Sequence, residues 1–336
     1  MRYIDAVGTT RRYSKIGLGT WQFGSREWGY GPEYDGAEAA RIVRRALELG
    51  VTVFDTAELY GFGRSERILG AALRTALEQT GTSREDIVVA SKILPVLPVS
   101  PVVQQRGVAS CARLGLGPID LYQVHRPHPL VHDASTMRGM RALREAGVIR
   151  DVGVSNHPVA RWRRAEAELG SPVLTDQVHY SLLARTPERR VIPYAERAGR
   201  IVMAYSPLAQ GLLTGKFDAH NRPARGIRAM NPLFLPENLD RVRPLLGLLR
   251  DIADAHGATP AQVALAWTIR HPAVMAIPGA SGVEQLESNA AAAELDLTPS
   301  ETDALSEASR GLGDLDRVRE LPRLLRDRLS RRPRGR

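Results

Sequence analysis

The feature that most constrains the fold of this 336-residue chain is an eightfold alternation of short apolar runs with longer amphipathic segments. The apolar runs predict buried strands, and the amphipathic segments predict the helices between them. The expected strands are 16–19, 52–55, 87–92, 119–125, 151–155, 174–178, 201–205 and 274–277. The expected helices are 36–49, 61–77, 101–114, 135–146, 159–169, 187–198, 260–270 and 283–293. Because composition does not change along these eight units, we expect a single α/β domain, a (β/α)8 TIM barrel, rather than an open sheet with a second domain.

Segments at both ends of the chain lie outside this alternation. Residues 1–5 and 11–13 flank a short turn sequence and predict an N-terminal β-hairpin, which we expect at the base of the barrel. Near the other end, Thr298 and Glu301 have the spacing of a capping box, which predicts a C-terminal helical extension. We therefore assign residues 1–310 to the barrel domain and residues 311–336 to a basic C-terminal tail.

Two local patterns add detail to the expected helices. Ser100 and Thr259 each precede a proline, and we expect both to cap the helices that follow them. Residues 206–256 form the longest interruption of the alternation, and residues 239–255 within it have the pattern of an apolar helix. Because this segment is too long for an ordinary loop, we expect it to have a function.

Composition and cysteine content predict a soluble, cytoplasmic protein. Hydrophobic residues make up 43% of the chain, enough for a large core, and no apolar run has the length of a transmembrane helix. The N-terminus lacks the basic and then apolar pattern of a secretory signal. A lone cysteine, Cys111, cannot form an intrachain disulfide.

The net charge of +9 raises the question of a nucleic-acid partner. Much of the excess comes from seven arginines between positions 323 and 336. This stretch has no interleaved aromatic residues, so a solvated, partly helical tail is favoured over a nucleic-acid-binding arm. The sequence does not indicate an oligomeric state.

Four polar side chains at three successive strand ends indicate a catalytic site. Asp55 ends the second expected strand and Tyr60 follows it, whereas Lys92 and His125 end the next two strands. A phenol has a pKa near 10, so it needs a nearby cation to become an effective proton donor and acceptor at neutral pH. Each residue alone could be structural. Because four of them meet at the face where barrels carry their sites, we interpret them as a catalytic group.

Several short motifs surround these residues in a fixed order. They are Asp55-Thr56-Ala57, Tyr60-Gly61, Ser65-Glu66, Leu69-Gly70, Ser91-Lys92, Asp120-Leu121-Tyr122-Gln123-Val124-His125, Gly153-Val154-Ser155-Asn156, Tyr205-Ser206-Pro207-Leu208 and Ile277-Pro278-Gly279-Ala280-Ser281. With these motifs, the chain resembles the aldo-keto reductase superfamily, and within it the branch that includes potassium-channel β subunits. The resemblance extends from about residue 17 to residue 292.

The resemblance implies a hydride-transfer enzyme that reduces aldehydes or ketones to alcohols and acts on CH–OH groups in reverse. It implies that Tyr60 is the general acid, that Lys92 lowers the pKa of Tyr60, and that Asp55 pairs with and orients Lys92. His125 is expected to hydrogen-bond the carbonyl oxygen, and no metal is required. A nicotinamide-binding regulatory or interaction subunit with little turnover is the alternative.

The chain lacks the common phosphate-binding motifs. Gln22 stands where a Gly-x-Gly-x-x-Gly motif after the first strand needs its third glycine, and residues 211–216 do not match a P-loop. Gly279-Ala280-Ser281 opens a helix instead and offers backbone N–H donors to a phosphate. Lys216 with Arg225 or Arg228 can add positive charge.

The resemblance also implies where NADP(H), or NAD(H), binds. Carboxamide contacts are expected from Ser155, Asn156 and Gln177, ring stacking from Tyr205, pyrophosphate contacts from the segment after it, and adenosine contacts from the last βα loop. The complete expected set is Gly19, Thr20, Trp21, Asp55, Ser155, Asn156, Gln177, Tyr205, Ser206, Pro207, Leu208, Gly211, Lys216, Arg228, Gly279, Ser281, Gln285 and Asn289. Ser288 departs from the glutamate common in the family, which bears on the preference for NADPH over NADH.

A small-molecule carbonyl substrate is expected beside the catalytic group. The residues expected to contact it are Trp21, Trp28, Tyr60, His125 and Arg126. Arg126 departs from the family pattern, in which an aromatic residue often follows the histidine. Its guanidinium can either bind an acidic substrate or project into solvent.

Overall fold

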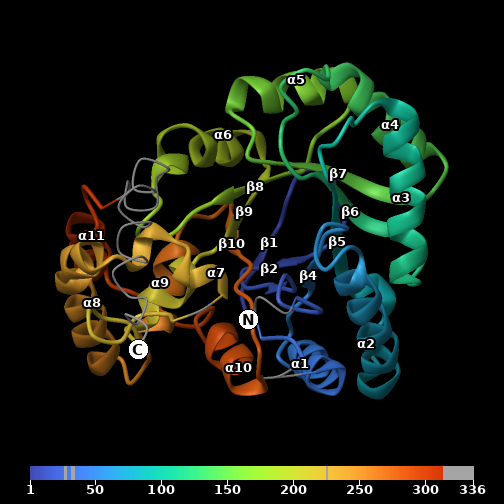
Figure 1. The fold of residues 1–336 in the computed structure, drawn as a ribbon. Helices are drawn as coiled ribbons and strands as arrows, with labels where there is room; N and C mark the ends of the chain where they lie inside the picture. Colours follow the sequence, from blue (N-terminus) through green and yellow to red (C-terminus); the bar gives the residue numbers. More distant parts are fainter. Residues whose placement is uncertain (26–28, 32–34, 225, 313–336) are drawn as a thin grey trace, which may run out of the picture.

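Eight parallel strands form the centre of the protein in the computed structural model, which describes residues 1–25, 29–31, 35–224 and 226–312 (Figure 1). They are β3 (Leu18–Gly19), β4 (Val53–Asp55), β5 (Val88–Ile93), β6 (Ile119–Val124), β7 (Ile149–Ser155), β8 (Thr175–His179), β9 (Ile201–Tyr205) and β10 (Val274–Ala276). Each strand pairs with its neighbours in chain order. Parallel bridges from Ile16 to Ala276 and from Gly19 to Gly279 join the first and last strands. The sheet therefore closes into the (β/α)8 barrel that the alternation predicted.

A ring of helices covers the outside of the barrel (Figure 1). The helices between and after the strands are α1 (Gly36–Glu48), α2 (Arg64–Thr80), α3 (Ser100–Leu114), α4 (Asp133–Glu145), α5 (Val159–Leu169), α6 (Val191–Ala198), α9 (Pro260–Thr268) and α10 (Val283–Ala291). In α1 the buried residues Ala39, Ile42, Val43 and Ala46 recur at helical spacing, so one apolar stripe faces the strands. The expected bounds are right to within a few residues in most cases. The segment expected as one helix over 187–198 is a 3-10 turn, Thr186–Arg189, followed by α6.

The long segment after β9 forms a structured layer of its own. It contains 3-10 turns over Ala209–Thr214 and Pro232–Phe234, and the helices α7 (Gly226–Ala229) and α8 (Pro236–Ala255). The C-terminal α11 (Pro299–Ala308) packs against α8 (Figure 1). The expected apolar helix over 239–255 is thus confirmed as part of α8.

The N-terminal hairpin closes the base of the barrel, as expected. Its strands, β1 (Tyr3–Ile4) and β2 (Tyr13–Ser14), are antiparallel. Ile4 and Tyr13 belong to one buried cluster with Leu121, Met203 and Met275 from the strands. Because this end is filled with apolar side chains, the opposite end, where the strands finish, is left to carry the site.

Two of the three predicted helix caps are confirmed, and one is wrong. Thr259 caps α9 in a full capping box, and Thr298 does the same for α11. The prediction for Ser100 is wrong, because Val99 is the N-cap of α3 and Ser100 is its first helical residue. Trp28, Arg225 and residues 313–336 lie outside the described residues. No helix in the described part of the chain has both the length and the apolar character to cross a membrane.

Candidate active site

The four predicted catalytic residues meet at the carboxyl ends of β4, β5 and β6. The Lys92 ammonium donates to Asp55 Oδ2 at 2.6 Å and lies 3.3 Å from the Tyr60 hydroxyl. It also donates to the backbone carbonyl of Thr56 at 2.8 Å. The His125 ring lies edge-on to the Tyr60 ring, with 5.8 Å between centroids. The cation, carboxylate and phenol thus form one connected group beside an imidazole.

Gln123 and Thr175, to which the sequence analysis gave no role, complete this group together with Gln177. Gln123 lies on β6 between residues that face the outer core, so its amide points into the barrel, where it contacts Asp55 Oδ1 at 3.4 Å. Gln177, expected only at the cofactor, donates to the same oxygen at 2.8 Å. Thr175 in turn donates to the Gln123 side-chain carbonyl at 3.2 Å. Polar residues inside otherwise apolar strands are the signal that could have identified Gln123 and Thr175.

Burial dominates the electrostatics of the group. Lys92 is 0% exposed and Asp55 is 2% exposed. Burial raises the pKa of the Tyr60 phenol above its ordinary value, and the Lys92 ammonium acts in the opposite direction. Lys92 thus lowers the pKa of Tyr60, as expected, but burial raises that pKa by more. Burial also opposes the charge on Lys92, yet Asp55 and Tyr60 outweigh it and leave the pKa of Lys92 raised.

His125 is held as a neutral imidazole. Burial, the Lys92 ammonium and the Arg126 guanidinium lower its pKa from 6.5 to about 3. Its Nδ1 atom is buried and has no hydrogen-bond partner among the described residues. At neutral pH one ring nitrogen therefore carries a proton that it can donate in a hydrogen bond.

One cavity of about 820 Å³ joins the catalytic group to the predicted cofactor residues. All described residues of the predicted cofactor and substrate sets line it. Lys92 contacts Tyr60 and Asp55, which form part of the cavity wall. Trp28 is the one member of these two sets that lies outside the described part of the chain. Lining residues that the sequence analysis did not assign to either set are Gln22, Leu59, Gln210, Thr214, Thr259, Pro260, Ala261, Ile277, Pro278, Glu284 and Ser288.

The carboxyl ends of β7, β8 and β9 form a polar wall of this cavity. Ser155 donates to the backbone carbonyl of Gln177 at 2.8 Å, and Asn156 donates to Ser155 Oγ at 2.9 Å. The Tyr205 hydroxyl donates to Asn156 Oδ1 at 3.0 Å. Asn156 has a φ of 58°, a left-handed conformation that is uncommon for residues other than glycine. This wall is therefore a connected polar surface held by an unusual backbone turn.

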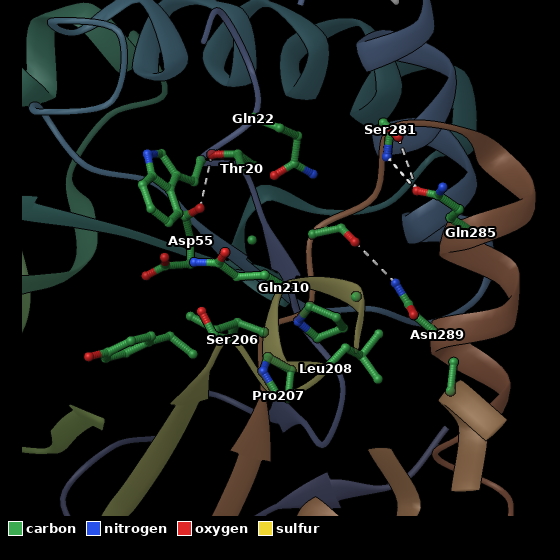
Figure 2. A pocket seen from close by; sticks show the side chains of 18 of the residues that line it. Thr20, Gln22, Asp55, Ser206, Pro207, Leu208, Gln210, Ser281, Gln285 and Asn289 are labelled. Carbon is green, nitrogen blue, oxygen red and sulfur yellow. Dashed lines mark hydrogen bonds between the residues drawn. The ribbon is translucent and has the colours of Figure 1, made fainter. Parts of the chain in front are cut away.

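Another part of the cavity wall comes from the loop between β10 and α10 and the start of α10, where Figure 2 shows Ser281, Gln285 and Asn289. Ser281 donates from its backbone and hydroxyl to Gln285, and Asn289 donates to the Gly279 carbonyl at 3.3 Å. A Cβ atom at Gly279 would lie 2.6 Å from the Gln22 side chain, so a larger residue would push that side chain away. Ser281 and Gln285 thus stand at the start of a helix, where backbone N–H groups favour an anion.

The segment after β9 also lines the cavity through Ser206, Pro207, Leu208 and Gln210 (Figure 2). Ser206, Ala209 and Gln210 have φ values of 51°, 48° and 57°, so three non-glycine residues adopt left-handed conformations within five positions. Arg228 donates to the Gln210 carbonyl at 2.9 Å. The strained turn and the Arg228 contact hold this segment across the cavity.

Comparison with known proteins identifies relatives along most of the chain. A family model described as the aldo/keto reductase family matches residues 15–310. A Mycobacterium tuberculosis (strain ATCC 25618 / H37Rv) protein named as an uncharacterised oxidoreductase is 53% identical over 332 residues, which is 99% of this chain and 100% of that protein. An aldo-keto reductase of Bacillus subtilis (strain 168) is 33% identical over 298 residues, 85% of this chain and 87% of that protein.

A solved structure shares both the fold and part of the sequence. It is the crystal structure of an aldo-keto reductase from Klebsiella pneumoniae in complex with NADPH. It superimposes with a TM-score of 0.72 at 29% identity, covering 95% of this chain and 100% of the other chain.

Proposed function

This chain belongs to the aldo/keto reductase family and is an oxidoreductase, and we propose that it uses NADPH to reduce aldehydes or ketones to alcohols. The observation that carries the proposal is the contact of one buried ammonium, Lys92, with both the Asp55 carboxylate and the Tyr60 hydroxyl. A structural ion pair would not need a phenol at 3.3 Å that also faces a cavity. The neutral His125 imidazole lines the same cavity.

The cavity residues fit a nicotinamide dinucleotide, the kind of cofactor bound to the Klebsiella pneumoniae relative. The Ser155, Asn156 and Gln177 wall would hold the carboxamide, and Tyr205 would lie against the ring. The start of α10 would take the adenosine end, since backbone N–H groups at the start of a helix favour an anion such as a phosphate. When bound, the cofactor supplies the hydride. NAD(H) fits the same contacts, and Ser288, which departs from the glutamate common in the family, lines the cavity.

Residues of this chain would donate the proton and stabilise the negative charge that develops on the carbonyl oxygen. A carbonyl that gains a hydride develops alkoxide character, and the Tyr60 hydroxyl would donate the proton that neutralises it. Lys92 would stabilise the phenolate left behind, and Asp55 would keep Lys92 charged and in place. His125 would donate a hydrogen bond to the same oxygen, because its neutral imidazole retains one N–H.

The test is NADPH consumption by the purified protein with reactive aldehydes, compared with a Tyr60→Phe variant. The variant loses the proton donor and almost no volume, so we expect turnover to fall by roughly 10²- to 10⁴-fold while NADPH affinity stays within about twofold. A variant that kept half of the wild-type rate on a substrate with limiting chemistry would remove Tyr60 from this role. Stoichiometric NADPH binding by the wild type without reduction of any aldehyde would instead favour a regulatory or interaction subunit.

A further inference from the structure

The charges lining the cavity are unevenly distributed between its two ends. The described cations that line it are Arg126, Lys216 and Arg228, and the described acids are Asp55 and Glu284. Lys216 and Arg228 belong to the segment after β9, and Glu284 belongs to α10. Asp55 is neutralised by Lys92. At the catalytic end, the guanidinium of Arg126 is therefore the described lining charge that no opposite charge neutralises.

Arg126 is placed to reach a substrate. It follows His125 directly at the end of β6, and both residues line the cavity. The Arg126 charge reaches the His125 ring strongly enough to lower the pKa of that imidazole. Among the described residues Arg126 forms no hydrogen bond or ion pair, whereas Arg106, Arg113 and Arg161 on the nearby helices α3 and α5 are all paired with carboxylates.

The mouth of the cavity beside Arg126 is apolar. Trp21 and Leu59, on the loops after β3 and β4, line the cavity and remain 38% and 39% exposed. Exposed apolar side chains on loops that line a cavity are a common mark of a ligand-binding surface.

We infer that the substrates are carbonyl compounds with an apolar body and a carboxylate, in which Arg126 binds the carboxylate and Trp21 and Leu59 contact the apolar body. The inference rests on the proposed reductase function, because Tyr60 and His125 must receive the carbonyl oxygen. A guanidinium binds a carboxylate through two parallel N–H donors, which fixes the orientation of the substrate as well as its charge. Sugars and short neutral aldehydes satisfy neither contact.

The decisive experiment compares matched aldehydes with wild type, Arg126→Gln and a control variant, Arg138→Gln. Arg138 is an exposed arginine on α4 that does not line the cavity, so its variant makes the same charge change elsewhere. We expect Arg126→Gln to lower kcat/KM for 4-carboxybenzaldehyde by about tenfold, mainly through KM, and to leave 4-nitrobenzaldehyde within about twofold. Arg138→Gln should change neither. Equal effects of Arg126→Gln on both aldehydes would overturn the carboxylate contact.

A second variant tests the apolar contact. Leu59→Ser should lower kcat/KM for both aromatic aldehydes by about three- to tenfold, because it removes apolar area that the aromatic ring covers. Succinic semialdehyde carries a carboxylate on a small flexible chain, so we expect it to be a poor substrate that Leu59→Ser leaves unchanged. Equal losses on all three aldehydes would overturn the apolar contact.

Ligand binding separates this inference from the proposed function. With the protein saturated by NADP⁺, tryptophan fluorescence should report tighter binding of benzoate than of benzamide, and Arg126→Gln should weaken only benzoate, by about tenfold. If this dependence is found and no aldehyde is reduced, the reductase function fails while the carboxylate contact stands. If benzoate and benzamide bind equally well, the carboxylate contact fails whatever the turnover.

Discussion

At the scale of single residues, Lys92 connects three groups of the proposed site. Its ammonium is buried, and it touches a carboxylate, a backbone carbonyl and a phenol at once. A buried charge of this kind is tolerated only when its partners satisfy it, which Asp55 does. The same contact makes Lys92 the group that opposes the effect of burial on the pKa of Tyr60.

Lys92→Met should therefore change the pH dependence of catalysis and not only its rate. Without the cation, the pKa of Tyr60 rises further, because burial and the Asp55 charge both act in that direction. Alcohol oxidation requires the phenolate, so its increase with pH should move to higher pH, and its rate at neutral pH should fall by at least about 10²-fold. The measurement is a pH profile of kcat for oxidation of an aromatic alcohol with NADP⁺.

A double variant guards this experiment against simple unfolding. Lys92→Met leaves the Asp55 carboxylate buried without its partner, a change that costs about 3–5 kcal/mol of stability. Adding Asp55→Asn removes that orphaned charge, so the double variant should recover thermal stability without recovering the pH profile. A wild-type profile in either variant would show that Lys92 does not control the Tyr60 proton.

At the scale of elements, close approach between helices depends on a few small residues. Gly70 lies in α2 against the C-terminal end of α3, and a Cβ atom there would lie 1.9 Å from the Leu114 carbonyl oxygen. One turn further along α2, Arg74 donates to this same oxygen at 3.1 Å. The Leu69-Gly70 motif is thus explained by packing, since α2 follows the loop that carries Tyr60 and its position helps to set that loop.

Gly70→Ala should destabilise the protein, although alanine is the better helix former. The backbone of α3 would have to move, and such overpacking costs about 1–3 kcal/mol or more. Gly247→Ala in α8 is the matched control, because no atom lies within 4 Å of its added Cβ and the helix preference for alanine should give about 1 kcal/mol of stabilisation. Chemical denaturation of the two variants measures both values. Stabilisation by Gly70→Ala would contradict the packing.

At the scale of the whole molecule, buried histidines couple stability to pH. His157 is 2% exposed beneath the turn that holds Asn156, and burial is the main cause that lowers its pKa from 6.5 to about 4. The unfolded chain therefore binds a proton that the folded chain does not bind between about pH 4 and pH 6.5. In that window His157 makes the protein less stable as pH falls.

A His157→Asn variant should lose this part of the pH dependence. An asparagine can retain a donor toward the Ser155 carbonyl, which His157 Nδ1 contacts at 3.0 Å. We expect the stability of the wild type, relative to the variant, to fall by up to roughly 1.4 kcal/mol per pH unit between pH 6 and pH 4.5. The comparison with the variant matters, because burial raises the pKa of Asp176 and gives it the opposite slope. Parallel stability curves would contradict the assignment.

The barrel and the convergence of four polar residues at its carboxyl-terminal face are what the sequence by itself determined. Hydrophobic periodicities of two and 3.6 residues are properties of the local sequence, so they identify strands and helices. Eight strand–helix units of this kind are typical of a closed barrel. Because strands in such a barrel are parallel, residues that end successive strands must share one face. Asp55, Lys92 and His125 could therefore be placed together from their positions in the chain, and Tyr60 from its place in the following loop.

Only the tertiary structure decided how these residues behave. That Gln123 and Gln177 hold Asp55, that burial outweighs Lys92 at Tyr60, and that Gly70 permits the contact of α2 with α3 all depend on distances between residues far apart in the chain. Such distances are set by strand register and barrel closure, which no local pattern encodes. Pairing and burial in turn set the pKa values and the free charge at Arg126, so chemistry that depends on them becomes visible only once the barrel has closed.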